Sequence, residues 1–379
     1  MENRIFLSPP CMGGDEQKYI QEAFDENYIA PLGKNVEMFE KDIKRYVGSN
    51  ECVALASGTS AIHVALIILG VKCDDEVLCS SFTFCASANP IIYLNAKPIF
   101  VDSEKSTWNI CPDLLEIAIE DRILKTGRAP KALVLVHLYG MPAQMDRIMT
   151  ICENYQIAVI EDAAEALGSS FKGKRLGTFG DFGVLSFNGN KIITTSGGGA
   201  LICDSQRWSD RARFLSTQAR DKAPYYQHSA IGYNYRMSNI VAGIGRGQMK
   251  VLDNHVAACR SNFVFYKELF SEVKGITFLS EPNDDYFSNY WLITILIDRD
   301  IAGFTNYDLL NAFEEANIET RPLWKPMHLQ PFFASAASYV NGVSEDLFNC
   351  GLCLPSGKNI TEEEKSRIVG TLKDFLSKY

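Results

Sequence analysis

The stretch that decides the fold is GDFGVLSFNGNK, residues 180–191, with the segment IITTSGGG that follows it at residues 192–199. An apolar run ends here in small polar residues, a single lysine and then three glycines. An ammonium group is costly to bury without a partner, but a lysine held near an apolar wall can lose its proton and attack a carbonyl carbon. Lys191 is therefore a candidate nucleophile. The competing interpretation is a solvated loop lysine beside a glycine turn.

An acidic stretch upstream favours the chemical interpretation. The residues EDAAEALG at 161–168 follow an apolar run at 157–160 that predicts a short strand. Asp162 would then lie at the carboxyl end of a strand, where open α/β sheets bind their ligands. Pyridoxal phosphate requires a carboxylate that keeps its pyridine nitrogen protonated and a lysine that binds its aldehyde as a Schiff base. We therefore expect Lys191 and Asp162 to share one site.

A hydroxyl-rich turn earlier in the chain is a candidate phosphate site. Residues 53–56 predict a strand, and a predicted helix runs from the following turn to Leu69. A strand, a small turn and the start of a helix together present backbone N–H groups to an anion. We expect the cofactor phosphate to bind at Gly58, Thr59 and Ser60. The alternative is that these residues only cap the helix.

Strand-like and helix-like segments alternate through most of the chain. This alternation predicts an α/β fold, with a mostly parallel central sheet and helices on both of its faces. The pattern changes near residue 251, so we expect a large cofactor-binding domain at residues 1–250. A smaller C-terminal α+β domain is expected at residues 251–379.

Composition argues against several classes of function. The net charge is −9 and no basic run occurs, so nucleic acid and anionic membrane surfaces are poor partners. No apolar run reaches the ~18 residues of a membrane span, and the N-terminus predicts no signal peptide, so the expected location is the cytoplasm. The 11 cysteines are expected as reduced thiols. Cys350 and Cys353 lack the further ligands of a zinc site, and no metal is expected.

The motifs EDAAE at 161–165 and SFNGNK at 186–191 resemble those of the DegT/DnrJ/EryC1/StrS sugar aminotransferases, which are pyridoxal phosphate enzymes of fold type I. The resemblance extends over nearly the whole chain. It implies that Lys191 binds the cofactor aldehyde and carries the proton, that Asp162 holds the pyridine nitrogen, and that Ser186 contacts the cofactor. Glu165 is a third catalytic candidate, at a position where relatives often carry histidine or glutamine.

The resemblance also implies contacts from other segments. Phe84 is expected to lie flat against the cofactor ring, although composition alone would place it in the core. Asn234, in the motif YNYR, is expected to reach the cofactor phosphate of a neighbouring subunit, which implies a homodimer with shared active sites. A polar and aromatic cluster near residue 321 would contact substrate, the alternative being a solvated surface patch. The substrate-binding candidates are Asn27, Tyr28, Ile29, Ala30, Arg321, Pro322, Leu323, Trp324, Lys325 and His328.

The implied activity is transfer of an amino group from L-glutamate to a nucleotide-linked keto-sugar. The stretches FLSPP at 6–10, NYIAPLG at 27–33 and RPLWK at 321–325 are most similar to enzymes that aminate C4 of a UDP-linked 4-keto-6-deoxy-N-acetylhexosamine. Those enzymes lie on the route to UDP-N-acetylbacillosamine in bacterial glycan synthesis. The alternative substrate is a GDP- or dTDP-linked keto-sugar that is aminated at C3 or C4.

Other classes of protein fit the sequence less well. Related dehydratases carry histidine at the lysine position, so Lys191 argues against dehydration. A nicotinamide-dependent sugar reductase requires a glycine fingerprint after its first strand, and GIGRG at 243–247 follows no predicted strand. A non-catalytic binding module would not need Lys191 and Asp162 together.

Overall fold

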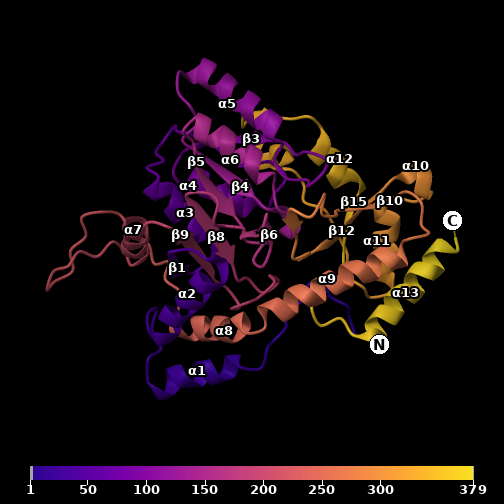
Figure 1. Ribbon diagram of the computed structural model, residues 1–379, viewed down its shortest axis with the longest axis horizontal. Coiled ribbons are helices and arrows are strands. Elements are labelled where there is room, and N and C mark those ends of the chain that lie inside the picture. The colour runs from indigo at the N-terminus through magenta and orange to yellow at the C-terminus, as the bar shows by residue number, and fades with distance from the viewer. Residues whose placement is uncertain (1–2, 379) are drawn as a thin grey trace.

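The computed structural model describes residues 3–378, and its largest element is an eight-stranded sheet (Figure 1). The strands lie in the spatial order β1 (Glu51–Leu55), β9 (Gly199–Cys203), β8 (Phe182–Ser186), β5 (Ala158–Asp162), β4 (Ala132–Val136), β2 (Glu76–Ser80), β3 (Lys97–Val101) and β14 (Ser338–Tyr339). Neighbours from β8 to β14 run parallel, whereas β9 is antiparallel to both of its neighbours. The predicted α/β fold with a mostly parallel sheet is confirmed.

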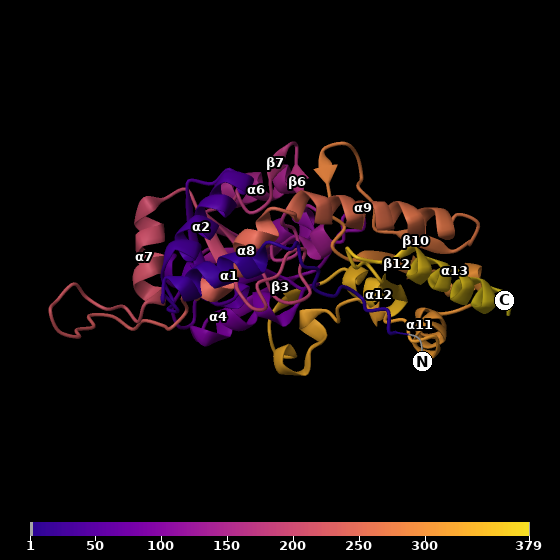
Figure 2. The ribbon, with the colours of Figure 1, turned by 90° about the horizontal axis from the view of Figure 1, so that it is seen from below.

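Helices cover both faces of this sheet because both faces are apolar. Successive strand residues alternate between two buried clusters, so that Leu133 belongs to one and Val134 to the other. The first cluster is covered by α2 (Lys34–Val47), α5 (Pro112–Thr126), α6 (Met145–Asn154) and α8 (Asn239–Met249). The second is covered by α3 (Gly58–Ile68), α4 (Asn89–Tyr93) and α7 (Gln206–Ser216). Helix α1 (Glu16–Asp25) packs on α8 (Figure 2).

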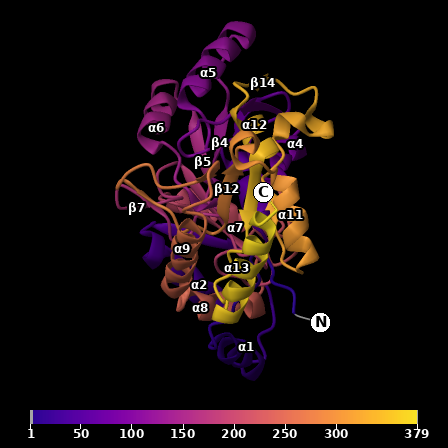
Figure 3. The same cartoon turned by 90° about the vertical axis from the view of Figure 1, so that its right-hand side faces the viewer.

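A second, antiparallel sheet lies beside the first. Its strands are β10 (Ile276–Phe278), β12 (Ile293–Ile297), β15 (Gly351–Leu354) and β13 (Arg321–Pro322). Helices α9 (Leu252–Leu269), α11 (Asn306–Glu315) and α13 (Glu362–Leu376) bury Tyr266, Phe313 and Leu372 in its core, and α13 is seen in front in Figure 3. The remaining elements are α10 (Arg299–Ala302), α12 (Val343–Cys350) and a small sheet of β11 (Tyr286–Phe287), β6 (Ser170–Phe171) and β7 (Lys174–Arg175).

The chain crosses between these two regions more than once. Strand β14, from the C-terminal part of the chain, pairs with β3 in the large sheet. Ile5, near the N-terminus, packs in the core of the smaller region and pairs with Ile318. The division of the chain at residue 250 therefore remains a prediction. Across residues 3–378, none of the helices has the length and apolar character needed to span a membrane.

Glu161 anchors the start of β8 to the end of β5. Its side chain is fully buried at the penultimate position of β5. The carboxylate accepts hydrogen bonds from His137 Nε2 at 3.0 Å and from the backbone N–H groups of Gly177 at 2.8 Å, Phe179 at 2.5 Å and Gly180 at 2.7 Å. A buried carboxylate with four donors is well satisfied. These contacts fix the strand end at which Asp162 is the next residue.

Replacing Glu161 by glutamine should lower the free energy of unfolding by about 2–4 kcal/mol, because an amide NH₂ would then face N–H groups that need an acceptor. Urea unfolding followed by circular dichroism measures the change. Glu116→Gln, on the exposed side of α5, is the matched control and should stay within ~0.5 kcal/mol of the parent. Equal stability of the two variants would contradict the anchoring role of Glu161.

Candidate active site

A cavity of about 420 Å³ opens at the carboxyl ends of β4, β5 and β8. Val136, Asp162 and Ser186, the last residues of these three strands, line it. Loops from other parts of the chain complete its walls. The sequence-predicted residues that line the cavity are Gly58, Thr59, Phe84, Asp162, Glu165, Ser186, Lys191 and Trp324. The structure thus brings the candidate nucleophile, the strand-end acid and part of the phosphate turn into one site.

Lys191 lies between an acid and an aromatic ring. Its Nζ is 3.4 Å from Glu165 Oε1 and 4.0 Å from the centroid of the Trp291 ring. The lysine side chain is mostly buried, with a relative exposure of 13%. The alternative of a solvated loop lysine is therefore wrong. Trp291 was not among the residues predicted to lie at the site.

The turn that carries Lys191 is held by its backbone carbonyl groups. The carbonyl of Asn190 accepts hydrogen bonds from Ser8 Oγ at 3.0 Å and from Trp291 Nε1 at 2.7 Å. The carbonyl of Lys191 accepts one from Lys358 Nζ at 2.9 Å, and that of Ile192 accepts one from His255 Nδ1 at 3.1 Å. Burial lowers the pKa of Lys358 and of His255. None of these four side chains was predicted to be near the site.

Asp162 is buried at the end of β5 with a relative exposure of 6%. Its Oδ2 accepts a hydrogen bond from Ser87 Oγ at 2.7 Å, and its Oδ1 accepts one from the backbone N–H of Ala164 at 3.2 Å. A carboxylate offers about four lone-pair positions. Asp162 therefore keeps acceptor capacity for a further donor from the cavity.

Glu165 is the second acid of the cavity. Its Oε2 accepts a hydrogen bond from the backbone N–H of Tyr139 at 2.7 Å, and its own backbone carbonyl accepts one from Asn289 Nδ2 at 2.9 Å. Burial raises the pKa of Glu165, while the Lys191 ammonium and the Tyr139 N–H oppose this shift. The carboxyl is thus fixed in place with one oxygen toward Lys191.

Part of the hydroxyl-rich turn caps helix α3, and part of it lines the cavity. Ser57 is the N-cap of α3, and its Oγ accepts a hydrogen bond from the backbone N–H of Ser60 at 3.0 Å. Ser60 is not among the residues that line the cavity. Its backbone N–H is used in the helix cap, as the alternative interpretation predicted. Gly58 and Thr59 do line the cavity. A Cβ at Gly58 would lie 3.3 Å from Ser186 Cβ, so glycine permits the close approach of this turn to β8.

The residues present fit pyridoxal phosphate. The N-terminus of α3 offers backbone N–H groups for a phosphate. Asp162 offers a carboxylate for a protonated ring nitrogen, and Lys191 an amine for the aldehyde. Phe84 is 52% exposed and lines the cavity, so its ring is free to contact a planar group. The alternative of Phe84 as a core residue is therefore wrong.

A second hollow of about 730 Å³ adjoins the cavity and shares Asn190, Trp291 and Trp324 with it. It is lined by the predicted substrate residues Arg321, Pro322, Leu323, Trp324 and Lys325. Trp324 stacks on Tyr139 at 6.1 Å and lies 5.4 Å from Phe84, measured between ring centroids. It therefore stands between the two spaces. His328 lines neither the cavity nor the second hollow. Its ring instead forms hydrogen bonds with Ser81 Oγ at 2.6 Å and Glu345 Oε1 at 3.2 Å.

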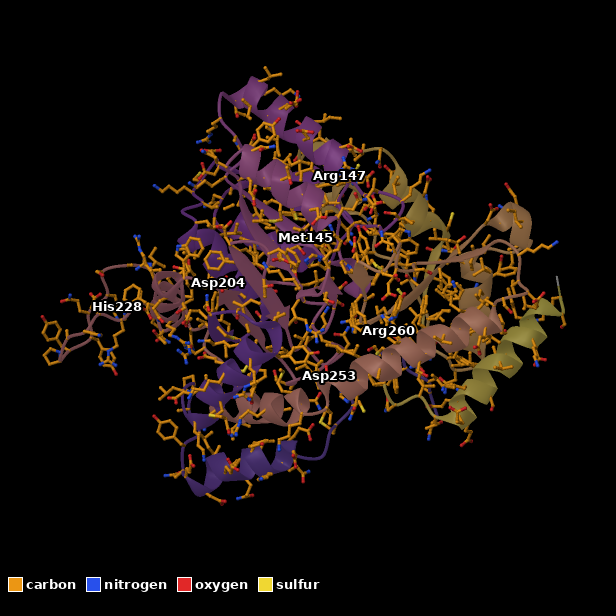
Figure 4. All side chains as sticks on the ribbon, in the orientation of Figure 1. Met145, Arg147, Asp204, His228, Asp253 and Arg260 are labelled. Atoms are coloured by element: carbon orange, nitrogen blue, oxygen red, sulfur yellow. The ribbon has the colours of Figure 1, made fainter. Side chains whose placement is uncertain are left out.

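Two predicted segments lie away from the cavity in this chain. The loop of Asn27, Tyr28, Ile29 and Ala30 rests on α8, where the carbonyls of Tyr28 and Ala30 accept hydrogen bonds from Asn239. Asn234 pairs with Thr217 at the base of a loop that projects from the body of the molecule. His228, labelled in Figure 4, marks this projecting loop. Neither segment contributes a residue to the lining of the cavity.

Comparison with known proteins identifies the family. A profile of the DegT/DnrJ/EryC1/StrS aminotransferase family matches residues 10–373. EpsN of Bacillus subtilis (strain 168), provisionally described as a pyridoxal phosphate-dependent aminotransferase, is 50% identical over 98% of this chain and 96% of its own. GDP-perosamine synthase of Escherichia coli O157:H7 is 34% identical over 97% of each chain. A DegT DnrJ EryC1 StrS aminotransferase from Brucella abortus has a crystal structure that matches with a TM-score of 0.87 at 27% identity, over 95% of each chain. The chain therefore belongs to the DegT/DnrJ/EryC1/StrS family and is a pyridoxal phosphate-dependent sugar aminotransferase.

Proposed function

We propose that the enzyme transfers the amino group of L-glutamate to C4 of a UDP-linked 4-keto-6-deoxy-N-acetylhexosamine. The products would be the UDP-4-amino sugar and 2-oxoglutarate, for bacterial glycan synthesis. The observation that carries this proposal is the meeting of Lys191, Asp162 and Glu165 in one cavity beside a wide second hollow. Two of the three stretches that carry the narrower resemblance, residues 6–10 and 321–325, line that hollow together, whereas residues 27–33 do not.

Five residues of the cavity have a task in the proposed amino transfer. Pyridoxal phosphate, when bound, supplies an electron-withdrawing pyridinium ring next to the reacting carbon. Asp162 would keep the proton on the ring nitrogen. Lys191 Nζ would move a proton from the donor carbon to the cofactor carbon, and in the second half-reaction from the cofactor carbon to the sugar carbon. The backbone N–H groups at Gly58 and Thr59 would hold the phosphate. Phe84 would pack against the ring and exclude water from that face.

Glu165 would act on Lys191 rather than on the substrate. Its Oε1 lies 3.4 Å from Lys191 Nζ, whereas its Oε2 is bonded to the Tyr139 N–H. Burial raises the pKa of the Glu165 carboxyl, whereas a positive charge on Lys191 lowers that pKa and favours the ionised form. The carboxyl can therefore compensate the charge of the lysine amine as that amine gains and loses its proton.

The proposed nucleotide-sugar site requires a homodimer. Asn234 and the loop at residues 27–30 lie away from the cavity of their own chain, yet both are expected to contact cofactor or substrate. Tyr225, Tyr226 and Ile231 of the projecting loop are 63%, 78% and 82% exposed, which is unusual for large apolar side chains. A second copy that covers this loop would receive Asn234 in its own cavity.

A GDP-linked keto-sugar is the second candidate substrate, because one relative is named GDP-perosamine synthase. The purified enzyme should be assayed with L-glutamate and UDP-, GDP- and dTDP-linked 4-keto-6-deoxy sugars, with product detected by mass spectrometry. We expect kcat/KM for the UDP-linked N-acetylated sugar to exceed the others by at least about tenfold. Lys191→Ala should lack both product and the visible absorbance of the lysine-linked cofactor. Preference for a GDP-sugar would overturn the UDP assignment.

The shared site can be tested with a tagged heterodimer of Lys191→Ala and Asn234→Ala chains. If Asn234 serves the partner's cavity, one of the two sites keeps both residues, and the heterodimer should show about half of wild-type activity. Both homodimers should be nearly inactive. If Asn234 served its own cavity, neither site would be intact and the heterodimer would be as inactive as the homodimers.

The pKa of Glu165 gives a pH dependence of stability. Because burial raises its pKa above the usual value of 4.5, folding favours the protonated carboxyl. Its contribution to stability is complete below that value and is lost as the pH rises through the raised pKa. The free energy of unfolding of the apoenzyme, relative to that of Glu165→Gln, should therefore fall as the pH is raised above 4.5. Urea unfolding at a series of pH values measures this. A difference that grows with pH would mean that Lys191 outweighs burial.

A further inference from the structure

Two buried hydroxyl groups stand behind Asp162. Ser87 and Thr83 are 1% and 2% exposed. Ser87 Oγ is 2.7 Å from Asp162 Oδ2, and Thr83 Oγ1 is 2.8 Å from Ser87 Oγ. Both residues also line the cavity. The three side chains form a short line of hydrogen bonds that ends at the carboxylate.

The direction of these hydrogen bonds follows from the chemistry of the groups. An ionised carboxylate only accepts, so Ser87 must donate its single hydroxyl proton to Asp162. Ser87 Oγ then has no proton left for Thr83, and Thr83 donates to it. The Ser87 O–H therefore points at Asp162, and the Thr83 O–H points at Ser87 Oγ, so that Thr83 supports the donor to the carboxylate. Hydrogen bonds to a charged acceptor are roughly twice as strong as neutral ones.

The same loop also supplies the ring of Phe84. The backbone N–H of Ser87 donates to the carbonyl of Phe84 at 3.2 Å, at the start of the short 3₁₀ turn Cys85–Ser87. The loop that follows β2 thus sets both the aromatic face of the cavity and the donor to its acid. Its position is the reason that these hydroxyl groups reach a residue 75 positions later in the chain.

We propose that Ser87, supported by Thr83, is a positioning residue that orients the Asp162 carboxylate toward the ring nitrogen of the cofactor. The proposal rests on the proposed role of Asp162. Ser87 and the Ala164 N–H occupy one position on each carboxylate oxygen and leave the others for the ring N–H. Without the serine hydroxyl the carboxylate would be free to turn, and its contact with the ring nitrogen would weaken.

The test compares two ligands that differ only at the ring nitrogen. Pyridoxamine phosphate and its analogue with carbon in place of that nitrogen are titrated into the apoenzyme by calorimetry, and the ratio of their Kd values is recorded. Neither ligand can form a Schiff base with Lys191, so the ratio reports the contact at the ring nitrogen. We expect wild type to prefer pyridoxamine phosphate, and Ser87→Ala to reduce this preference about tenfold. A role of Ser87 in packing alone would weaken both ligands equally and leave the ratio unchanged, which would overturn the proposal.

Further variants separate this proposal from the role of Asp162. Asp162→Asn should abolish the preference, and adding Ser87→Ala to it should cause no further change. If Asp162→Asn left the ratio unchanged, the role of Asp162 itself would be wrong. If Asp162→Asn abolished the preference but Ser87→Ala kept it, only the inference about Ser87 would fall.

Thr83 offers a matched pair should Ser87→Ala fail to fold. Thr83→Val keeps the shape of the side chain and removes the hydroxyl, whereas Thr83→Ser keeps the hydroxyl. The valine variant should lose part of the preference for the ring nitrogen, and the serine variant should retain it. Equal ratios in the two variants would overturn the supporting role of Thr83.

Discussion

The position of Lys191 depends on hydrogen bonds to three consecutive carbonyl oxygens. Residues 187–198 form neither helix nor strand, and local backbone hydrogen bonds join Phe187 to Thr195 and Gly198 at the base of this loop. Ser8, Trp291, Lys358 and His255 reach the turn in addition, from distant parts of the chain. Buried backbone carbonyls need partners, and here those partners also determine where the lysine amine can go. A reacting amine misplaced by ~1 Å loses much of its rate, so these contacts matter for chemistry as well as for stability.

The acids at the end of β5 differ in their partners, although they lie within five residues of one another. Glu161 is enclosed by donors and anchors the backbone. Asp162 has a hydroxyl and one amide as donors and faces the cavity. Glu165 faces Lys191 and one amide. One short acidic motif thus supplies a structural anchor, the proposed partner for a ring nitrogen and a partner for an amine. The alternation of side chains along a strand explains why Glu161 and Asp162 face different surroundings.

Much of the fold could be predicted from sequence because it depends on local patterns. Alternating apolar and amphipathic runs indicated the parallel sheet, and the strand before Asp162 gave the edge where ligands bind. The turn at Gly58 and Thr59 followed from its neighbouring strand and helix. Ser87, Trp291 and Lys358 could not be found this way, because each is an ordinary residue in its own segment and acquires its role through contacts with residues far along the chain.

Other sequence predictions needed knowledge of neighbouring side chains. Ser60 looked like part of an anion cup, but its amide is already bonded to Ser57. His328 looked like a substrate residue, but its ring is held by Ser81 and Glu345. Phe84 shows the opposite case, since an apolar residue that composition would bury is half exposed at the cavity. Hydrogen-bond partners and exposure, rather than residue type, decide between such alternatives.

The support of the lysine turn by Ser8 and Lys358 has a consequence for biosynthesis. A chain that leaves the ribosome with its N-terminus first can form much of the large sheet while later residues are still being added. The carbonyl of Lys191 has its partner only after residue 358 has emerged. The lysine turn therefore completes its hydrogen bonds only late in the synthesis of each polypeptide.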